Sequence, residues 1–200
     1  MSENTLLWFA RMIALVGLGL LIFSSVGGVV MSSKFTAKVG RRFAWLKGNR
    51  IFTYHRRISL IGASLFLLHP IPLLFSPKTT GGLNLTNVLL PFTASRQTLY
   101  TGFGTLAFYV LLVVVVSSLL IKRMKFKDWR ILHYGTYLFL ILGFAHSLLI
   151  SAEYKPGELF DFEEPEKQIL LLMATIVVLF VIWRIIAARR HHANKLSRAT

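Results

Sequence analysis

Five long apolar stretches are the feature that most constrains how this chain can fold. The run from Phe103 to Ile121 contains no charged residue, and about 17–25 predominantly apolar residues are the length a helix needs to cross a hydrocarbon core of about 30 Å. The 200 residues are 54% hydrophobic and only 16% charged, too apolar for a soluble domain of this size. The sequence therefore predicts an all-α membrane protein, a bundle of about five transmembrane helices that forms a single domain over residues 1–200. The expected spans are 6–30, 53–75, 100–121, 130–150 and 168–186, followed by a basic tail at 187–200.

The distribution of charge predicts how the bundle is oriented. Although the net charge of +15 is compatible with nucleic-acid binding, the positive residues gather in every second connection, which is the positive-inside pattern of a membrane protein. We expect these segments to be cytoplasmic, with the N-terminus outside and the C-terminus inside a plasma (inner) membrane, and with membrane lipid rather than nucleic acid as partner. The basic residues are Lys34, Lys38, Arg41, Arg42, Lys47 and Arg50; Lys122, Arg123, Lys125 and Lys127; and Arg189, Arg190, Lys195 and Arg198. The segment from Glu153 to Lys167 is acidic instead.

Histidine is the residue that indicates chemistry inside the bundle. The chain has no cysteine, which excludes disulfides, thiolate metal sites, iron–sulfur clusters and covalently attached c-type haem. Four of its six histidines lie in or at the ends of the second and fourth spans, where ionisable groups are costly and mark functional sites. These four are His55, His69, His133 and His146.

The spacing of these histidines predicts two facing pairs. Separations of 14 and 13 residues correspond to about 20 Å along a helix, and both spans are expected to run from inside to outside, so His55 should lie level with His133 and His69 with His146. Facing imidazoles without a third ligand suit the axial ligation of haem iron, whereas zinc or a di-iron centre needs three or four converging ligands. We expect two haems b stacked at two depths between the second and fourth helices.

Irregular helix geometry is expected near these histidines. On an ideal helix a spacing of 13 residues misses the starting direction by about 140°, so the fourth span should tilt or wind irregularly, or one haem should be rotated. Gly135 and Gly143 make local adjustment of the helix easier. Pro70 and Pro72 should bend or end the second helix just beyond His69. The apolar segment 83–92 is too short to span and is expected to cap the outer pair.

Two stretches of sequence resemble a known family. Tyr54-His55-Arg56-Arg57-Ile58 with His69, and Trp129-Arg130-Ile131-Leu132-His133 with His146, resemble the ferric reductase-like transmembrane domain of ferric reductases and NADPH oxidases, over about residues 50–183. Haem b proteins of the cytochrome bc type also pair histidines at similar spacings. The resemblance to the ferric reductase group implies an inner haem on His55 and His133, an outer haem on His69 and His146, outward electron flow, and an aromatic residue between the haems, for which Phe139 is the candidate.

Charged residues near the histidines have two interpretations each. Arg56, Arg57 and Arg130 could pair with propionates of the inner haem or could extend to the membrane interface. Arg11, the only charge in the first span, is a candidate for the outer propionates. His191 and His192 belong to the polar tail and are expected to be solvated.

These observations predict transmembrane electron transfer from a cytoplasmic-side donor to an outer acceptor. The string Gly102-Phe103-Gly104 opens a span and is not a dinucleotide fingerprint, so we expect no flavin on this chain. The electron donor is then expected to be a separate flavoprotein, quinol or other carrier. The chain itself would be the membrane component of an oxidoreductase. Ferric iron, oxygen, a quinone or a partner enzyme are the acceptors compatible with this reading. One alternative is a haem-bearing anchor subunit of a larger redox complex. Another is a haem-free scaffold or transporter with a histidine proton relay, which the lack of acidic residues within the spans disfavours.

Overall fold

The computed structural model describes residues 3–32, 48–76, 83–95, 97–150 and 165–196, and these residues form helices and their connections. Five helical segments are long and apolar enough to cross a membrane: Thr5–Met31, Arg50–Leu74, Thr98–Leu119, Phe126–Leu149 and Pro165–Trp183. Each agrees with an expected span, and the largest difference is at the start of the fourth, which begins at residue 126 rather than 130. The helices are α1 (Glu3–Ser32), α3 (Gly48–Leu68), α4 (Pro70–Leu74), α5 (Leu85–Leu89), α6 (Thr98–Leu119), the short 3-10 helix η3 (Ile121–Arg123), α7 (Phe126–His133), α8 (Gly135–Leu149) and α9 (Pro165–Leu196).

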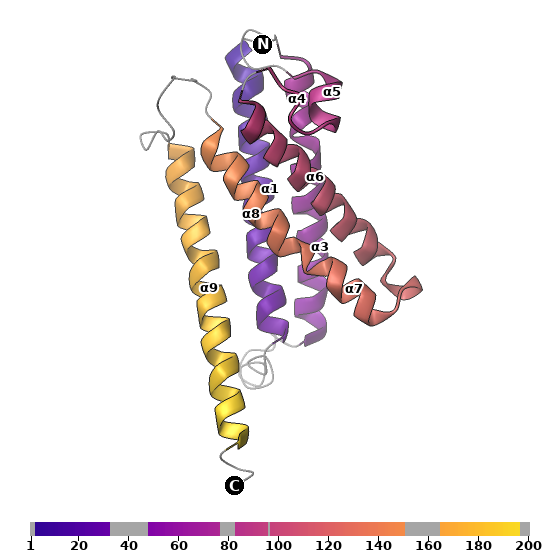
Figure 1. Cartoon of the computed structure of the whole chain (residues 1–200), viewed down its shortest axis with the longest axis vertical. Coiled ribbons are helices and arrows are strands. Elements are labelled where there is room, and N and C mark those ends of the chain that lie inside the picture. The colour runs from indigo at the N-terminus through magenta and orange to yellow at the C-terminus, as the bar shows by residue number, and fades with distance from the viewer. Residues whose placement is uncertain (1–2, 33–47, 77–82, 96, 151–164, 197–200) are drawn as a thin grey trace.

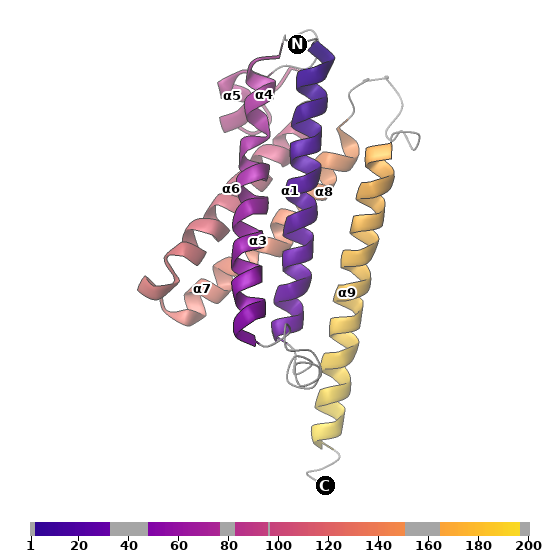
Figure 2. The same cartoon turned by 180° about the vertical axis from the view of Figure 1, so that it is seen from behind.

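The bundle is built from two helix pairs and one outlying helix. Helix α1 packs along α3, α6 packs along α8, and α9 contacts α1 and α8. We call the end of the bundle at which α1 begins the upper end, as drawn in Figure 1. Helices α3 and α7–α8 both run from the lower end to the upper end, and α9 extends past the lower end of the other helices (Figures 1 and 2). The parallel direction expected for the second and fourth spans is therefore present.

Two glycines allow α1 and α3 to approach closely. A Cβ atom placed on Gly17 would lie 2.9 Å from the backbone nitrogen of Phe66, and one placed on Gly62 would lie 3.0 Å from the backbone oxygen of Gly17. Small residues at crossings are the usual way for membrane helices to pack, because helix association in lipid depends on close van der Waals contact. This crossing fixes α1 directly against the helix that carries His55 and His69.

The core of the bundle lies where α3 and α8 are covered by α1 and α6. Phe66 on α3 and Phe139 on α8 are almost completely buried, and their rings meet edge to face with centroids 5.0 Å apart. Leu18 on α1 and Ala107 on α6 are buried in the same cluster. Along the chain, Phe66 lies between His55 and His69, and this aromatic pair fills the interior between the two histidine levels.

Both histidine-bearing spans are interrupted, which the prolines predict for the second span and which is one of the alternatives expected for the fourth. The second breaks at His69 between α3 and α4, directly before Pro70. The fourth breaks at Tyr134 between α7 and α8, where the Tyr134 amide is shared among the carbonyls of residues 130, 131 and 132. The irregular winding follows His133 immediately and therefore rotates α8, with His146, relative to α7.

Several charged segments named above fall partly outside the described residues. These are the basic segment at 34–47, the acidic residues at 153–164 and the end of the tail at 197–200; the side chains of His191 and His192 are also not described. At the lower end, Lys122, Arg123, Lys125 and Lys127 are exposed around η3 and the start of α7.

Candidate functional site

The four histidines form two facing pairs at two levels of the bundle. The ring centroids of His55 and His133 are 6.2 Å apart at the lower level, and those of His69 and His146 are 6.4 Å apart at the upper level. We call these the lower pair and the upper pair. Among the described residues, no group of three or more histidine, cysteine or acidic side chains gathers to hold a metal ion. The imidazoles therefore meet in twos, as their spacing predicts.

In the upper pair, each Nδ1 atom contacts a backbone carbonyl. His69 Nδ1 donates to the carbonyl oxygen of Phe66, and His146 Nδ1 donates to that of Tyr100 at 2.8 Å. A carbonyl can only accept a hydrogen bond, so in each neutral ring the proton resides on Nδ1. This tautomer leaves the lone pair of Nε2 available to a ligand.

The lower pair has the same feature in a weaker form. His55 Nδ1 donates to the backbone oxygen of Ser24 at 2.9 Å and also lies 2.8 Å from the hydroxyl of the same residue. The Ser24 hydroxyl lies 2.6 Å from that of Ser59. His133 Nδ1 lies 3.4 Å from the hydroxyl of Ser118. A second hydrogen bond that fixes the tautomer and orientation of the ring is characteristic of histidines that bind metals.

Pro70 explains why the Phe66 carbonyl is free to accept from His69. In a continuous helix this carbonyl would accept from the amide of residue 70, but proline has no amide hydrogen. The His69 ring takes the place of the missing donor. Thus the proline that ends α3 also orients the histidine beside it.

Two glycines allow the rings of His55 and His146 to reach the backbone carbonyls that they contact. Gly28 on α1 and Gly104 on α6 each lie four residues after the carbonyl that the histidine contacts, and a side chain at that position would cover the carbonyl. A Cβ atom on Gly104 would lie 2.7 Å from the Nδ1 and Cε1 atoms of His146, and one on Gly28 would lie 3.3 Å from Cε1 of His55. The sequence analysis did not identify Gly28 and Gly104. The signal that could have revealed them is the presence of glycine inside the two spans that pack against the histidine-bearing helices.

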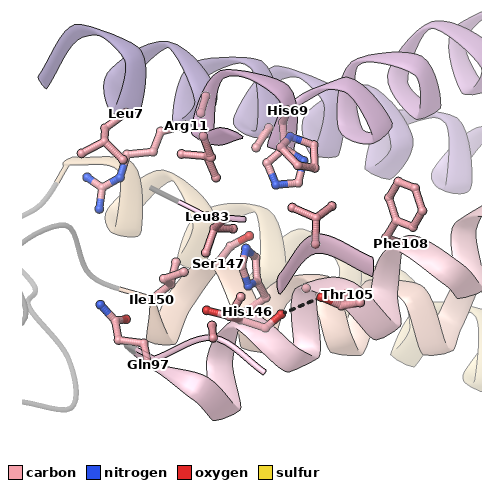
Figure 3. A pocket seen from close by; sticks show the side chains of 18 of the residues that line it. Leu7, Arg11, His69, Leu83, Gln97, Thr105, Phe108, His146, Ser147 and Ile150 are labelled. Atoms are coloured by element: carbon pink, nitrogen blue, oxygen red, sulfur yellow. Dashed lines mark hydrogen bonds between the residues drawn. The ribbon is translucent and has the colours of Figure 1, made fainter. Parts of the chain in front are cut away.

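A cavity of about 210 Å³ surrounds the upper pair. This is more than ten times the volume that a single water molecule requires, about 10–15 Å³. His69 and His146 face each other across it, with Arg11 and Gln97 toward one end and Phe108 toward the other (Figure 3). The segment expected to cap this site does contribute to it, since Leu83, Asn87 and Val88 line the cavity. The hydroxyls of Thr105 and Tyr109 on α6 donate to the carbonyls of Asn87 and Leu89 on α5.

Aromatic and basic residues surround the lower pair. The Trp129 ring stacks on that of His133 with centroids 4.9 Å apart and an interplanar angle of 24°. The Trp129 indole nitrogen is buried without a hydrogen-bond partner among the described residues. Arg56, Arg57 and Arg130 are exposed at the same end of the bundle, and their pairing with a bound group stays a prediction.

Phe139 lies where the sequence analysis expects an aromatic residue. Its side chain is fully buried on α8 between the levels of His133 and His146. Phe66, which the sequence analysis did not consider, contacts both Phe139 and the His69 ring, with centroid distances of 5.0 and 5.1 Å. The two phenylalanines thus extend from the upper pair toward the lower one.

The fold and the site define a helical membrane protein with histidine pairs at two depths. Comparison with protein families gives a match to the model described as ferric reductase like transmembrane component, over residues 29–144. Because the match covers more than half of the chain, the protein belongs to the ferric reductase-like transmembrane component family. The matched region contains three of the four histidines and ends two residues before His146. Comparisons with curated proteins and with solved structures give no match.

Proposed function

We propose that this protein transfers electrons across the membrane through two b-type haems. His69 and His146 hold one haem and His55 and His133 hold the other. Membership of the ferric reductase-like family supports transmembrane electron transfer as the general activity. The geometry of the two histidine pairs is the observation that supports haem as the cofactor.

The separation of the rings fits a metal centre between them. A metal–imidazole bond is about 2.0 Å long and a ring nitrogen lies about 1.1 Å from the ring centre, so an ion held on a straight line between two imidazoles separates their centroids by about 6.2 Å. The observed separations are 6.2 and 6.4 Å. Direct packing of aromatic rings is compatible with a wider range of distances, about 4.5–7 Å, and gives no reason for two pairs to agree so closely.

The hydrogen bonds at Nδ1 support the same assignment. In His55, His69 and His146 they place the proton of the neutral ring on Nδ1 and leave Nε2 as the free ligand atom, which is the form that haem iron requires. The cavity around the upper pair supplies space beyond the two rings. A bound haem supplies a one-electron centre that alternates between ferric and ferrous iron.

The residues of this chain then have distinct roles. The four histidines bind and orient the two centres, and the carbonyls of Ser24, Phe66 and Tyr100 fix three of the rings. Phe66 and Phe139 exclude water from the region between the centres and hold them apart. The proposal thus keeps Phe139 between the two macrocycles.

We propose that electrons enter at the lower end and leave at the upper end. The exposed basic residues around η3 and α7 support a cytoplasmic lower end, because positive residues gather on the cytoplasmic side of membrane proteins. This places the first pair to be reduced, His55 and His133, nearest to a cytoplasmic donor such as a flavoprotein or quinol. The acceptor is then reduced on the outer side of the plasma membrane.

The decisive experiment is a haem count on the purified protein. A reduced-minus-oxidised spectrum together with a pyridine haemochrome assay should give two haems b per chain, because each level offers one complete ligand pair. A protein without haem would contradict the proposal.

Single substitutions should separate the two centres. His146→Leu should remove the upper haem and keep most of the lower one, and His133→Leu should do the reverse, because each variant leaves the other pair complete. Redox titration of the spectra distinguishes the two components. Equal loss of both components in folded variants would contradict the assignment of ligands to levels.

A further inference from the structure

The ring of His133 is held differently from those of the other three paired histidines. Among the described residues, the hydrogen-bond partner of its Nδ1 atom is the Ser118 hydroxyl at 3.4 Å, which is longer than the usual length of about 2.7–3.2 Å. The rings of His55, His69 and His146 instead donate to backbone carbonyls. A hydroxyl can also rotate, so this hydrogen bond orients the His133 ring only weakly.

The indole ring of Trp129 gives His133 a different support. The two ring centroids are 4.9 Å apart and the planes are inclined by only 24°, so the rings stack. Residues four apart are neighbours on one face of a helix, and side chains lean toward the start of their helix, so the His133 ring lies back over Trp129. The contact between Phe66 and His69 is tilted instead, at 54°. A parallel face restricts rotation of the imidazole about its own bond to the chain.

The place of His133 in the helix makes this support important. His133 is the last residue of α7, and the backbone winds irregularly at the next residue. Trp129 lies one turn earlier, in the regular part of α7, where the ring of Phe126 contacts it with centroids 5.3 Å apart. The His133 ring is therefore packed against a side chain that the irregular turn does not displace.

The plane of the His133 ring determines a property that can be measured at a bound haem. The ring planes of His55 and His133 are inclined by 75°, whereas those of His69 and His146 are inclined by 55°. In a ferric haem with two imidazole ligands, nearly perpendicular ligand planes leave two iron d orbitals almost equal in energy. This raises the largest g value of the low-spin signal in electron paramagnetic resonance (EPR).

We infer that Trp129 is a positioning residue that holds the His133 imidazole nearly perpendicular to that of His55 at the lower haem. This inference rests on the proposed function and adds to it a residue that sets the electronic structure of one of the two centres. The stacked face of the indole has this role. Because the indole nitrogen has no hydrogen-bond partner among the described residues, a phenylalanine ring should be able to replace it.

The test is EPR spectroscopy of the oxidised, haem-loaded full chain. The wild type should give two low-spin signals, and the one that His133→Leu removes should have the larger g value. Trp129→Phe should keep both signals. In Trp129→Leu the signal of the lower haem should broaden and move to a smaller g value, because the His133 ring can rotate to smaller angles, while the signal of the upper haem stays the same.

The matched control is Trp8→Leu, which removes an exposed tryptophan from the upper end of α1 and should change neither signal. Transfer of haem to an excess of apomyoglobin gives a second result. Loss from the lower site should be about two- to tenfold faster in Trp129→Leu, as expected for the loss of one stacked aromatic pair, and close to the wild-type rate in Trp129→Phe.

Two results would overturn the inference: a lower-haem signal that does not move in Trp129→Leu, or one that moves equally in Trp129→Phe. If Trp129→Leu also loses the upper haem, its fold is disturbed, and Trp129→Met, which keeps more of the side-chain volume without a ring, takes its place with the same expected shift. Wild-type protein that binds no haem would instead contradict the proposed function itself.

Discussion

At the scale of single residues, the site depends on which atom of each imidazole is already engaged. Three of the four Nδ1 atoms donate to helix carbonyls. Those carbonyls are accessible because a glycine or a proline lies four residues further along, at position 28, 70 or 104. The absence of a side chain or of an amide hydrogen thus lets Nδ1 reach the carbonyl and leaves Nε2 available to a ligand.

Alanine substitutions at three glycines should affect the haems in a graded way. Gly104→Ala places a methyl group 2.7 Å from the His146 ring and should remove most of the upper haem, because the ring must move away from the Tyr100 carbonyl. Gly28→Ala gives a longer contact of 3.3 Å with His55 and should weaken the lower haem only in part. The measurement is the haem content and spectrum of each purified variant.

Gly27 is the matched control for this series. An added Cβ atom at Gly27 meets nothing within 4 Å, so Gly27→Ala should retain both haems. Alanine favours a helix over glycine by about 1 kcal/mol, so a weakened helix does not explain a loss of haem. If Gly104→Ala kept a full upper haem, the proposed close packing of His146 against α6 would be wrong.

At the scale of helices, the two interruptions lie beside the ligands. Helix α3 ends just before His69, and α7 ends at His133. A straight fourth span would leave His133 and His146 about 140° apart around its axis. The break at Tyr134 relieves this mismatch and allows both residues to face α3.

Replacing Pro70 tests the link between the helix break and the ligand. Pro70→Ala restores an amide hydrogen that can bond to the Phe66 carbonyl and compete with His69 Nδ1. A weaker hydrogen bond at Nδ1 makes the imidazole a poorer electron donor, so the potential of the upper haem should rise. Because a hydrogen bond contributes about 0.5–1.5 kcal/mol and a one-electron centre shifts by about 59 mV per tenfold change in equilibrium, we expect a rise of roughly 20–60 mV.

Pro72→Ala is the control for this experiment. Residue 72 lies in the same short helix α4, but the carbonyl four residues before it belongs to Leu68. The histidine rings instead donate to the carbonyls of Ser24, Phe66 and Tyr100. Redox titration should show little change in this variant. A potential that falls in Pro70→Ala, or that rises equally in both variants, would contradict the role assigned to the Phe66 carbonyl.

At the scale of the whole molecule, the proposed direction of electron transfer depends on where the exposed charge lies relative to the two histidine pairs. The lower pair lies at the end where Lys122, Arg123, Lys125 and Lys127 are exposed. A positive surface accelerates encounter with an acidic partner by electrostatic steering. The proposed electron donor is therefore expected to bind at the lower end.

Oriented proteoliposomes should show this direction. A membrane-impermeant ferric acceptor at the upper end should be reduced when an acidic flavoprotein donor is supplied at the lower end. Raising the ionic strength from about 0.01 M to about 1 M shortens the screening length from about 30 Å to about 3 Å, and the rate of electron entry should fall by about tenfold or more. Equal entry from both ends, or a rate that does not depend on salt, would contradict binding of the donor at the lower end.

Local patterns in the chain were sufficient to predict the spans, the four histidines, their pairing by level and the two helix interruptions. These features depend on the length of apolar runs, on the rise of 1.5 Å per residue and on the chemistry of proline, all of which act within one helix. Arg11 and the 83–92 segment were expected near the outer histidines because of their positions along the chain, and both line the upper cavity.

Tertiary structure decided which groups complete the site. Ser24, Gly28, Gly104 and Ser118 belong to α1 and α6, and they reach the histidines only through the rotation and close crossing of those helices. The lipid-facing and protein-facing sides of a membrane helix differ little in sequence, because lipid and protein interior are similarly apolar. The rotation of each helix therefore cannot be derived from hydrophobic periodicity and is set only when the helices pack.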